Sequence, residues 1–289
     1  MQEKPIAFAA LFIGAAAIAI APILVRQSDC SPVASAFWRM ALAAPVLWCW
    51  VLVTERTGHR TPSSGRPHWK LLALAGFFFA CDLASWHLSI LRTSVANATL
   101  ALNMAPIFVT LGGWLLFRQS VARTFLLGLA VTMVGASILI GPNFRGSDSA
   151  LLGDGLGVLA GFFYACYMLS IKSASANNST ARIMAVSTTI SALLLAPVAL
   201  ATDGNTLPAS TSGWLILLAL AIVVHVIGQS LIAFGFATLP AAMSSVSLLL
   251  QPVMAAIYAW ILLGEAMTSL SMLGAFVVLI GIYIAKRAS

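Results

Sequence analysis

The stretch Thr93 to Phe117, TSVANATLALNMAPIFVTLGGWLLF, has a counterpart 146 residues further along, LPAAMSSVSLLLQPVMAAIYAWILLGE, running from Leu239 to Glu265. At this one offset, landmark residues align in pairs without a gap: Pro106 with Pro252, Gly128 with Gly274, Gly135 with Gly281, and Arg26 with Lys172. Apolar segments share Leu, Ala and Val by chance, but landmark pairs at one offset indicate an internal repeat. We therefore divide the chain into repeats 1–145 and 146–289, which form one structural unit.

The composition excludes a soluble globular protein. Of the 289 residues, 61% are hydrophobic and only 8% charged, against roughly 25% charged in soluble domains. Ten apolar runs approach the about 20 residues that a membrane-spanning helix needs. Their lengths and lack of apolar and polar alternation favour helices over a barrel. The predicted fold is an all-α integral membrane bundle of ten transmembrane helices, over 6–25, 35–53, 71–91, 95–117, 125–140, 152–170, 183–200, 214–239, 241–263 and 272–285.

The positions of the basic residues predict the orientation. With a cytoplasmic amino terminus, eleven Lys and Arg residues lie in or beside inner segments and three in outer loops. This asymmetry puts both termini in the cytoplasm. Each repeat holds five spans, and because five is odd the second repeat is inverted relative to the first. Inverted repeats are typical of carriers whose central site opens alternately to either side.

The two aligned stretches resemble the fourth and ninth helices of the drug/metabolite transporter superfamily, EamA type. The similarity includes the proline near mid-helix, the Gly-Glu pair ending the second copy, and the LGxxxxxxG start of the following helix. The resemblance covers nearly the whole chain and implies a cavity formed by helices one, three and four with six, eight and nine. It also implies export of amino acids or other small metabolites. Gln119 departs from the pattern by standing where the second copy has Glu265, a residue we expect in a loop or helix cap.

Ionisable residues near the middle of a membrane need a partner, a wet cavity or a function. Asp82 lies about 18 Å into the third span, and we leave open whether it forms a structural ion pair or handles substrate or protons. Arg39, in the second span, is interpreted as structural. His225 lies at similar depth, and the repeat offset sends it to Phe79, one turn from Asp82. His225 could therefore face the Asp82 cavity, binding a carboxylate or titrating, or it could hydrogen-bond to a neighbouring backbone or hydroxyl group.

Further polar residues complete the candidate site. Trp86 and Gln229 continue the polar faces one turn along their helices, and Tyr164 and Tyr167 share one face of the sixth span. Prolines inside helices free a carbonyl that a cavity can use. The aromatic residues are equally compatible with packing. The predicted substrate-binding residues are Asp82, Trp86, Asn103, Tyr164, Tyr167, His225, Gln229 and Gln251, and the predicted hinge or bend points are Pro106 and Pro252.

The favoured function is secondary transport: export of small metabolites, with amino acids as the leading substrate class, by alternating access through the central cavity. No GxxxxGK[ST] motif is present, so we expect no use of ATP, and a coupled proton is one candidate energy source. The alternatives are a multidrug or other metabolite carrier of the same fold, and a membrane-embedded enzyme. The enzyme is disfavoured because nucleophile-elbow and HExxH motifs are absent.

The same features predict the cellular location and the partners of the protein. We expect a multi-pass protein of the plasma membrane, here the bacterial cytoplasmic membrane, whose partners are a small-molecule substrate and the lipid bilayer. Cys30, Cys49, Cys81 and Cys166 lack metal-ligand spacing, so neither metal nor cofactor is expected. The formal charge of +7 belongs to the loops and does not indicate nucleic acid. A monomer is expected.

Overall fold

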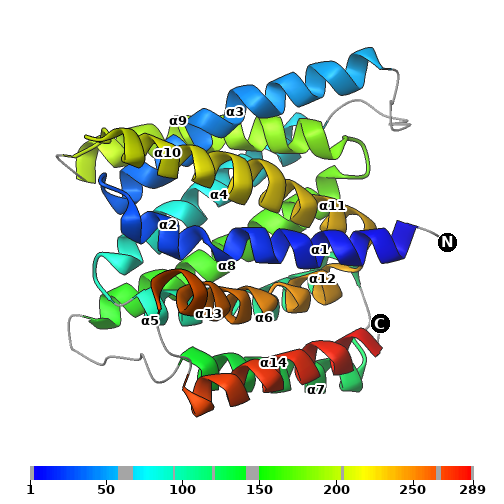
Figure 1. Cartoon of the computed structure of the whole chain (residues 1–289). Coiled ribbons are helices and arrows are strands. Elements are labelled where there is room, and N and C mark those ends of the chain that lie inside the picture. Colours follow the sequence, from blue (N-terminus) through cyan, green and yellow to red (C-terminus); the bar gives the residue numbers. More distant parts are fainter. Residues whose placement is uncertain are drawn as a thin grey trace.

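The computed structural model describes residues 3–57, 68–93, 95–118, 121–140, 150–202, 205–264 and 268–287, and all regular structure within these ranges is helical. The helices lie roughly parallel in stacked layers, and α1 begins at the same end of the bundle at which α14 ends (Figure 1). The elements are α1 (Glu3–Ala19), α2 (Ala21–Gln27), α3 (Pro32–Arg56), α4 (Trp69–Ile90), α5 (Val95–Leu102), α6 (Ala105–Phe117), α7 (Arg123–Ile140), α8 (Ala150–Ala174), α9 (Thr180–Thr202), α10 (Thr211–Ala219), η2 (Leu220–Gln229), α11 (Ser230–Thr238), α12 (Ala241–Ser247), α13 (Leu250–Leu263) and α14 (Ser269–Arg287).

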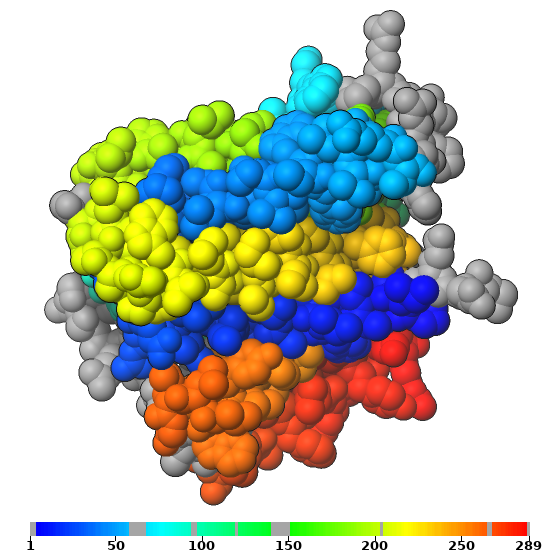
Figure 2. All heavy atoms as spheres, turned by 45° about the horizontal axis from the view of Figure 1, so that its top comes forward, coloured from blue at the N-terminus to red at the C-terminus, as the bar shows by residue number. Residues whose placement is uncertain are grey.

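The helices have the length and composition of membrane spans. Among the described residues, nine helical segments are long and apolar enough to cross a bilayer, and Arg123–Leu139 is apolar but shorter. Large apolar side chains such as Leu193 and Leu200 are exposed on the outer surface, where lipid rather than water surrounds a spanning helix. Figure 2 shows one such face, on which α3, α10 with α11, and α1 lie side by side. The prediction of an all-helical, multi-pass membrane protein is confirmed.

Four of the predicted spans are interrupted rather than continuous. The first breaks at Ile20, ahead of Pro22, and the fourth breaks just before Pro106. The ninth breaks at the matching place, where α12 ends three residues before α13 begins and Pro252 follows. Proline cannot donate the backbone hydrogen bond that continues a helix, which explains these breaks. In the eighth span the helix widens into the ten-residue π-helix η2.

Glycines bring α7 and α14 into backbone contact. A Cβ added at Gly128 would lie 2.5 Å from the backbone nitrogen of Ala285, and one added at Gly274 would lie 2.5 Å from that of Leu139. Both contacts involve the same two positions of the repeat, with the halves exchanged. Gln119 and Glu265, for which a loop or cap role was expected, lie outside the described residues.

Candidate functional site

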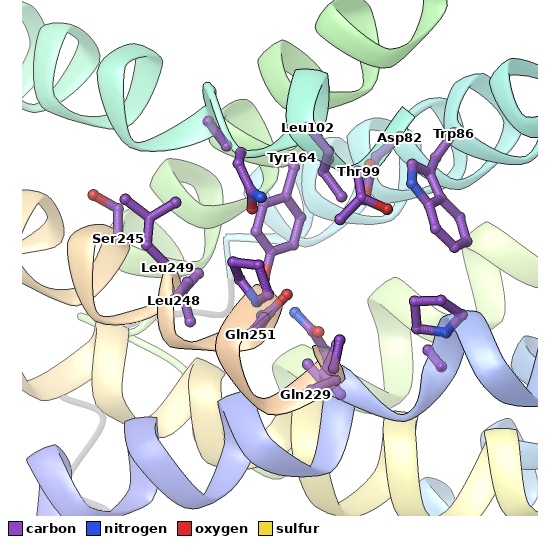
Figure 3. A pocket seen from close by; sticks show the side chains of 18 of the residues that line it. Asp82, Trp86, Thr99, Leu102, Tyr164, Gln229, Ser245, Leu248, Leu249 and Gln251 are labelled. Atoms are coloured by element: carbon purple, nitrogen blue, oxygen red, sulfur yellow. The ribbon is translucent and has the colours of Figure 1, made fainter. Parts of the chain in front are cut away.

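A cavity lies where the interrupted helices meet (Figure 3). Its wall comes from the first, third, fourth, sixth, eighth and ninth predicted spans, as the family resemblance implied, together with Arg39 from α3. Most of the wall is apolar. The lining residues are Ile18, Ala19, Ala21, Pro22, Arg39, Phe79, Asp82, Leu83, Trp86, Thr99, Leu102, Asn103, Ala105, Pro106, Val109, Tyr164, Gln229, Ser245, Leu248, Leu249, Gln251, Pro252 and Ala255.

The helix breaks coincide with the cavity. Pro22, Pro106 and Pro252 all belong to the wall, and Gln229 is the last residue of the π-helix. Irregular backbone inside a membrane is tolerated where it lines a cavity or is buried in protein. In transporters, discontinuous helices commonly form the substrate site. The breaks therefore bring irregular backbone and several polar side chains to the cavity.

Two buried charged residues face this cavity. The residues Arg39 and Asp82 are only 6% and 5% exposed, and they attract each other electrostatically. They do not form a direct ion pair, and the Nε of Arg39 has no hydrogen-bond partner among the described residues. Because a buried charge is costly unless it is paired and hydrogen-bonded, this part of the wall retains unsatisfied electrostatic and hydrogen-bonding capacity.

The neutral polar residues gather on the same wall. Figure 3 shows Tyr164 pointing toward Gln251, and its hydroxyl lies beside the amides of Gln229 and Gln251. Several buried nitrogen atoms here lack a partner within the described protein: Trp86 Nε1, Asn103 Nδ2, Gln229 Nε2 and Gln251 Nε2. An unsatisfied buried donor costs about 1–3 kcal/mol. A solute that accepts hydrogen bonds in the cavity would recover part of this free energy.

Two of the predicted site residues, His225 and Tyr167, do not reach the cavity wall. The Nε2 of His225 is 2.7 Å from the hydroxyl of Thr188, and its ring stacks on Phe79 with centroids 5.4 Å apart. Tyr167 also stacks on Phe79, at 4.3 Å. Both side chains are fully buried. The expectation that His225 and Asp82 face one cavity is therefore not met, and the alternative, a hydrogen bond to a neighbouring hydroxyl, is the arrangement found.

The π-helix accounts for part of this difference. The prediction placed His225 and Gln229 on one stripe by assuming α-helical spacing, whereas a π-helix pairs residues five apart and shifts the faces. Gln229 consequently lines the cavity while His225 points away. Conversely, Arg39 was interpreted as structural but belongs to the wall. Pro22 was overlooked, although a proline inside an apolar run was a usable signal.

Polar contacts also connect α8 to its neighbours at both of its ends. Near its start, an Oδ1 atom of Asp154 accepts hydrogen bonds from Thr93, at 2.9 Å, and Asn97, at 3.3 Å. Near its end, the Nζ of Lys172 donates to the backbone carbonyls of Ala237 and Leu239, both at 3.0 Å. The Asp154 contacts therefore join one end of α8 to the beginning of α5, and the Lys172 contacts join its other end to the end of α11.

No metal site emerges in the described part of the chain, since no three His, Cys, Asp or Glu side chains there come together. The polar groups of the cavity are instead single, spaced side chains on different helices. This arrangement suits binding of a small organic solute more than metal ligation.

Comparison with known proteins agrees with the fold. Residues 5–141 and 151–286 each match the model of the EamA-like transporter family. An uncharacterized transporter of Archaeoglobus fulgidus is 24% identical over 91% of this chain and 90% of its own. The pseudopaline exporter CntI of Pseudomonas aeruginosa is 25% identical over 84% of this chain and 82% of its own. One crystal structure is similar in fold, with a TM-score of 0.83 at 14% identity, covering 99% of this chain and 98% of that one.

Proposed function

Because the chain belongs to the EamA-like transporter family, we propose that this membrane transporter exports small metabolites, and amino acids in particular, through the cavity around Asp82. The observation that carries the proposal is the cavity itself. It is mostly apolar and buried, it lies where discontinuous helices meet, and it presents a few polar side chains with unsatisfied hydrogen bonds. Solute-binding sites have this composition.

The proposed architecture is a ten-span bundle of two inverted five-helix repeats, 1–145 and 146–289, with both termini in the cytoplasm. The double family match supports two repeats. The contacts between α7 and α14 support a two-fold relation between them, because Gly128 with Ala285 becomes Gly274 with Leu139 when the halves are exchanged. The basic inner segments support the orientation.

We propose alternating access as the transport cycle. Pro106 and Pro252 interrupt paired helices at the cavity, which suits them as bend points. Asp154 and Lys172 hold α8 to its neighbours at opposite ends of the bundle. In an inverted-repeat carrier the two ends open in turn around a fixed site. Breaking one of these polar contacts while keeping the other would favour opening at that end.

The second candidate is a carrier of apolar drugs or other metabolites, which the largely apolar wall favours. The two candidates differ in what the charged pair does. An amino-acid carrier needs Arg39 and Asp82 for substrate binding, whereas a carrier of apolar drugs would use the aromatic and aliphatic wall and depend little on them.

The test is flux into proteoliposomes of a panel of labelled amino acids, drugs, nucleobases and sugars, with and without an imposed pH gradient. The variants are Asp82→Asn and a matched surface control, Glu55→Gln, whose carboxylate pairs with Arg182 at a partly exposed position. Saturable amino-acid flux that falls in Asp82→Asn but not in Glu55→Gln supports the proposal. Flux restricted to other solutes contradicts the amino-acid assignment, and flux independent of the pH gradient excludes proton coupling.

A further inference from the structure

The cavity wall carries one basic and one acidic side chain that are held apart. Arg39 and Asp82 are both more than nine-tenths buried, and they interact electrostatically without forming a direct ion pair. No described group donates a hydrogen bond to the Asp82 carboxylate, whose electrostatic partner is Arg39. The Nε of Arg39 likewise has no hydrogen-bond partner in the described part of the chain. Each charge therefore keeps a free binding direction within the cavity.

The rest of the wall does not compensate these charges. Beyond Arg39 and Asp82, the described residues that line the cavity are all neutral. Trp86, one turn from Asp82 on the same helix, contributes a buried indole N–H to which no described group offers an acceptor. The described lining thus presents one basic and one acidic group, which together form a dipole across the cavity.

A ligand must match this dipole to bind well. A cation would neutralise Asp82 but leave Arg39 facing a second positive charge, and an anion would do the reverse. A buried charge without a partner is strongly destabilising. A molecule that carries both an anionic and a cationic group can satisfy both residues at once, and charge-assisted hydrogen bonds are the strongest type available to it.

We infer, building on the proposed transport function, that the cavity selects zwitterions, with Arg39 binding the carboxylate of the solute and Asp82 its ammonium group. The apolar remainder of the solute then lies against Leu83, Leu102 and Val109, which line the same cavity. Arg39 is in this view a specificity-determining residue rather than a purely structural partner of Asp82. The amides around Tyr164 provide further donors to the carboxylate.

The experiment measures proteoliposome flux of three labelled probes: leucine, its amide, which lacks the carboxylate, and N-acetylleucine, which lacks the ammonium group. The variants are Arg39→Gln, Asp82→Asn and the double variant. The controls are Arg182→Gln and Glu55→Gln, which break a partly exposed ion pair away from the cavity. Removing one charge-assisted contact should weaken binding about 10- to 100-fold.

We expect the wild type and both controls to prefer leucine over the two capped probes by at least tenfold. Arg39→Gln should show a lower flux of leucine and a higher flux of leucine amide. Asp82→Asn should show a lower flux of leucine and a higher flux of N-acetylleucine. The double variant should lose the preference altogether. This crossed pattern separates binding from a structural role, because loss of a structural ion pair would lower the flux of all probes together and lower thermal stability in detergent.

Two negative results have different meanings. If the wild type transports none of the three probes or any other amino acid, the proposed function fails, and the inference fails with it. If the wild type transports leucine and both capped probes equally, or if all variants lose all probes in parallel, the zwitterion inference is overturned while the transporter assignment stands.

Discussion

Substitution of Gly128 by alanine tests the packing that joins α7 to α14. A Cβ at this position would lie 2.5 Å, 2.8 Å and 2.9 Å from the N, Cα and Cβ atoms of Ala285. These neighbours are backbone or attached directly to it, so no side-chain rotation relieves the overlap. The two helices would have to separate by about 1 Å to restore ordinary van der Waals contact.

The expected magnitude follows from two opposing effects. Overpacking a well-packed interface costs about 1–3 kcal/mol. Because the added Cβ of Gly128→Ala overlaps backbone atoms, its cost lies toward the upper end of this range. Alanine is about 1 kcal/mol more favourable than glycine within a helix. The difference is a net loss of about 2 kcal/mol in the free energy of unfolding.

The assay is unfolding in mixed detergent micelles with increasing sodium dodecyl sulfate, followed by circular dichroism. The matched control is Gly155→Ala on α8, where an added Cβ meets nothing within 4 Å. This variant should be as stable as the wild type or more stable, by up to about 1 kcal/mol. Gly274→Ala should be destabilised as much as Gly128→Ala, because its Cβ meets Leu139 in the same way. A Gly128→Ala protein as stable as Gly155→Ala would refute the reasoning, and an unaffected Gly274→Ala would contradict the two-fold relation.

Four further substitutions address the loops and the two ends of the bundle. Hydrogen bonds from Ser210 lower the pKa of Asp29 below 3.8, so its carboxylate stabilises the folded state above that pH and loses this contribution as the pH falls through the lowered pKa. The melting temperatures of Asp29→Ala and wild type should therefore differ at neutral pH and converge in strong acid. A cysteine introduced into the cavity should be labelled faster in Asp154→Ala when the reagent is added at one membrane face, and faster in Lys172→Met when it is added at the opposite face. Faster labelling from the same face in both variants would disagree with the placement of these two residues. Arg118 directly follows α6 and has a φ of 51°, so Arg118→Gly should gain about 1 kcal/mol in the same micelle assay. A loss would show that its side chain matters more than its backbone strain.

The sequence predicted the spans well because apolar length is a local property. The run 71–91 corresponds to α4, Trp69–Ile90, and the run 183–200 lies inside α9, Thr180–Thr202. The prolines at 106 and 252 marked the two matching breaks in advance. The π-helix could not be predicted, since an i to i+5 hydrogen-bond pattern leaves no simple signature in a uniformly apolar run.

The candidate site was predicted only in part, and the reason differs from the one that made the spans predictable. Asp82 stood out because an ionisable group inside a membrane demands an explanation, and it does line the cavity. The placement of His225 and Tyr167 depended on tertiary packing, because Phe79 lies between them and stacks on both rings. Whether Arg39 contacts Asp82 directly likewise depends on how α3 sits against α4, which no periodicity reveals.

The repeat explains the scaffold but not the chemistry of the site. The offset of 146 sends Arg39 to Ala185 and Asp82 to Gly228, so the second half has neither charge. At Gly228 an added Cβ would lie 2.9 Å from the side chain of Ile18, which means that the position equivalent to the cavity aspartate is a close helix contact. If the two ends of the bundle open in turn, each half must pass between a packed and an open arrangement, yet the positions in the second half that are equivalent to Arg39 and Asp82 carry no charge to receive the solute. The same Arg39 and Asp82 must then serve both open states, which requires them to stay at the centre while the helices around them move.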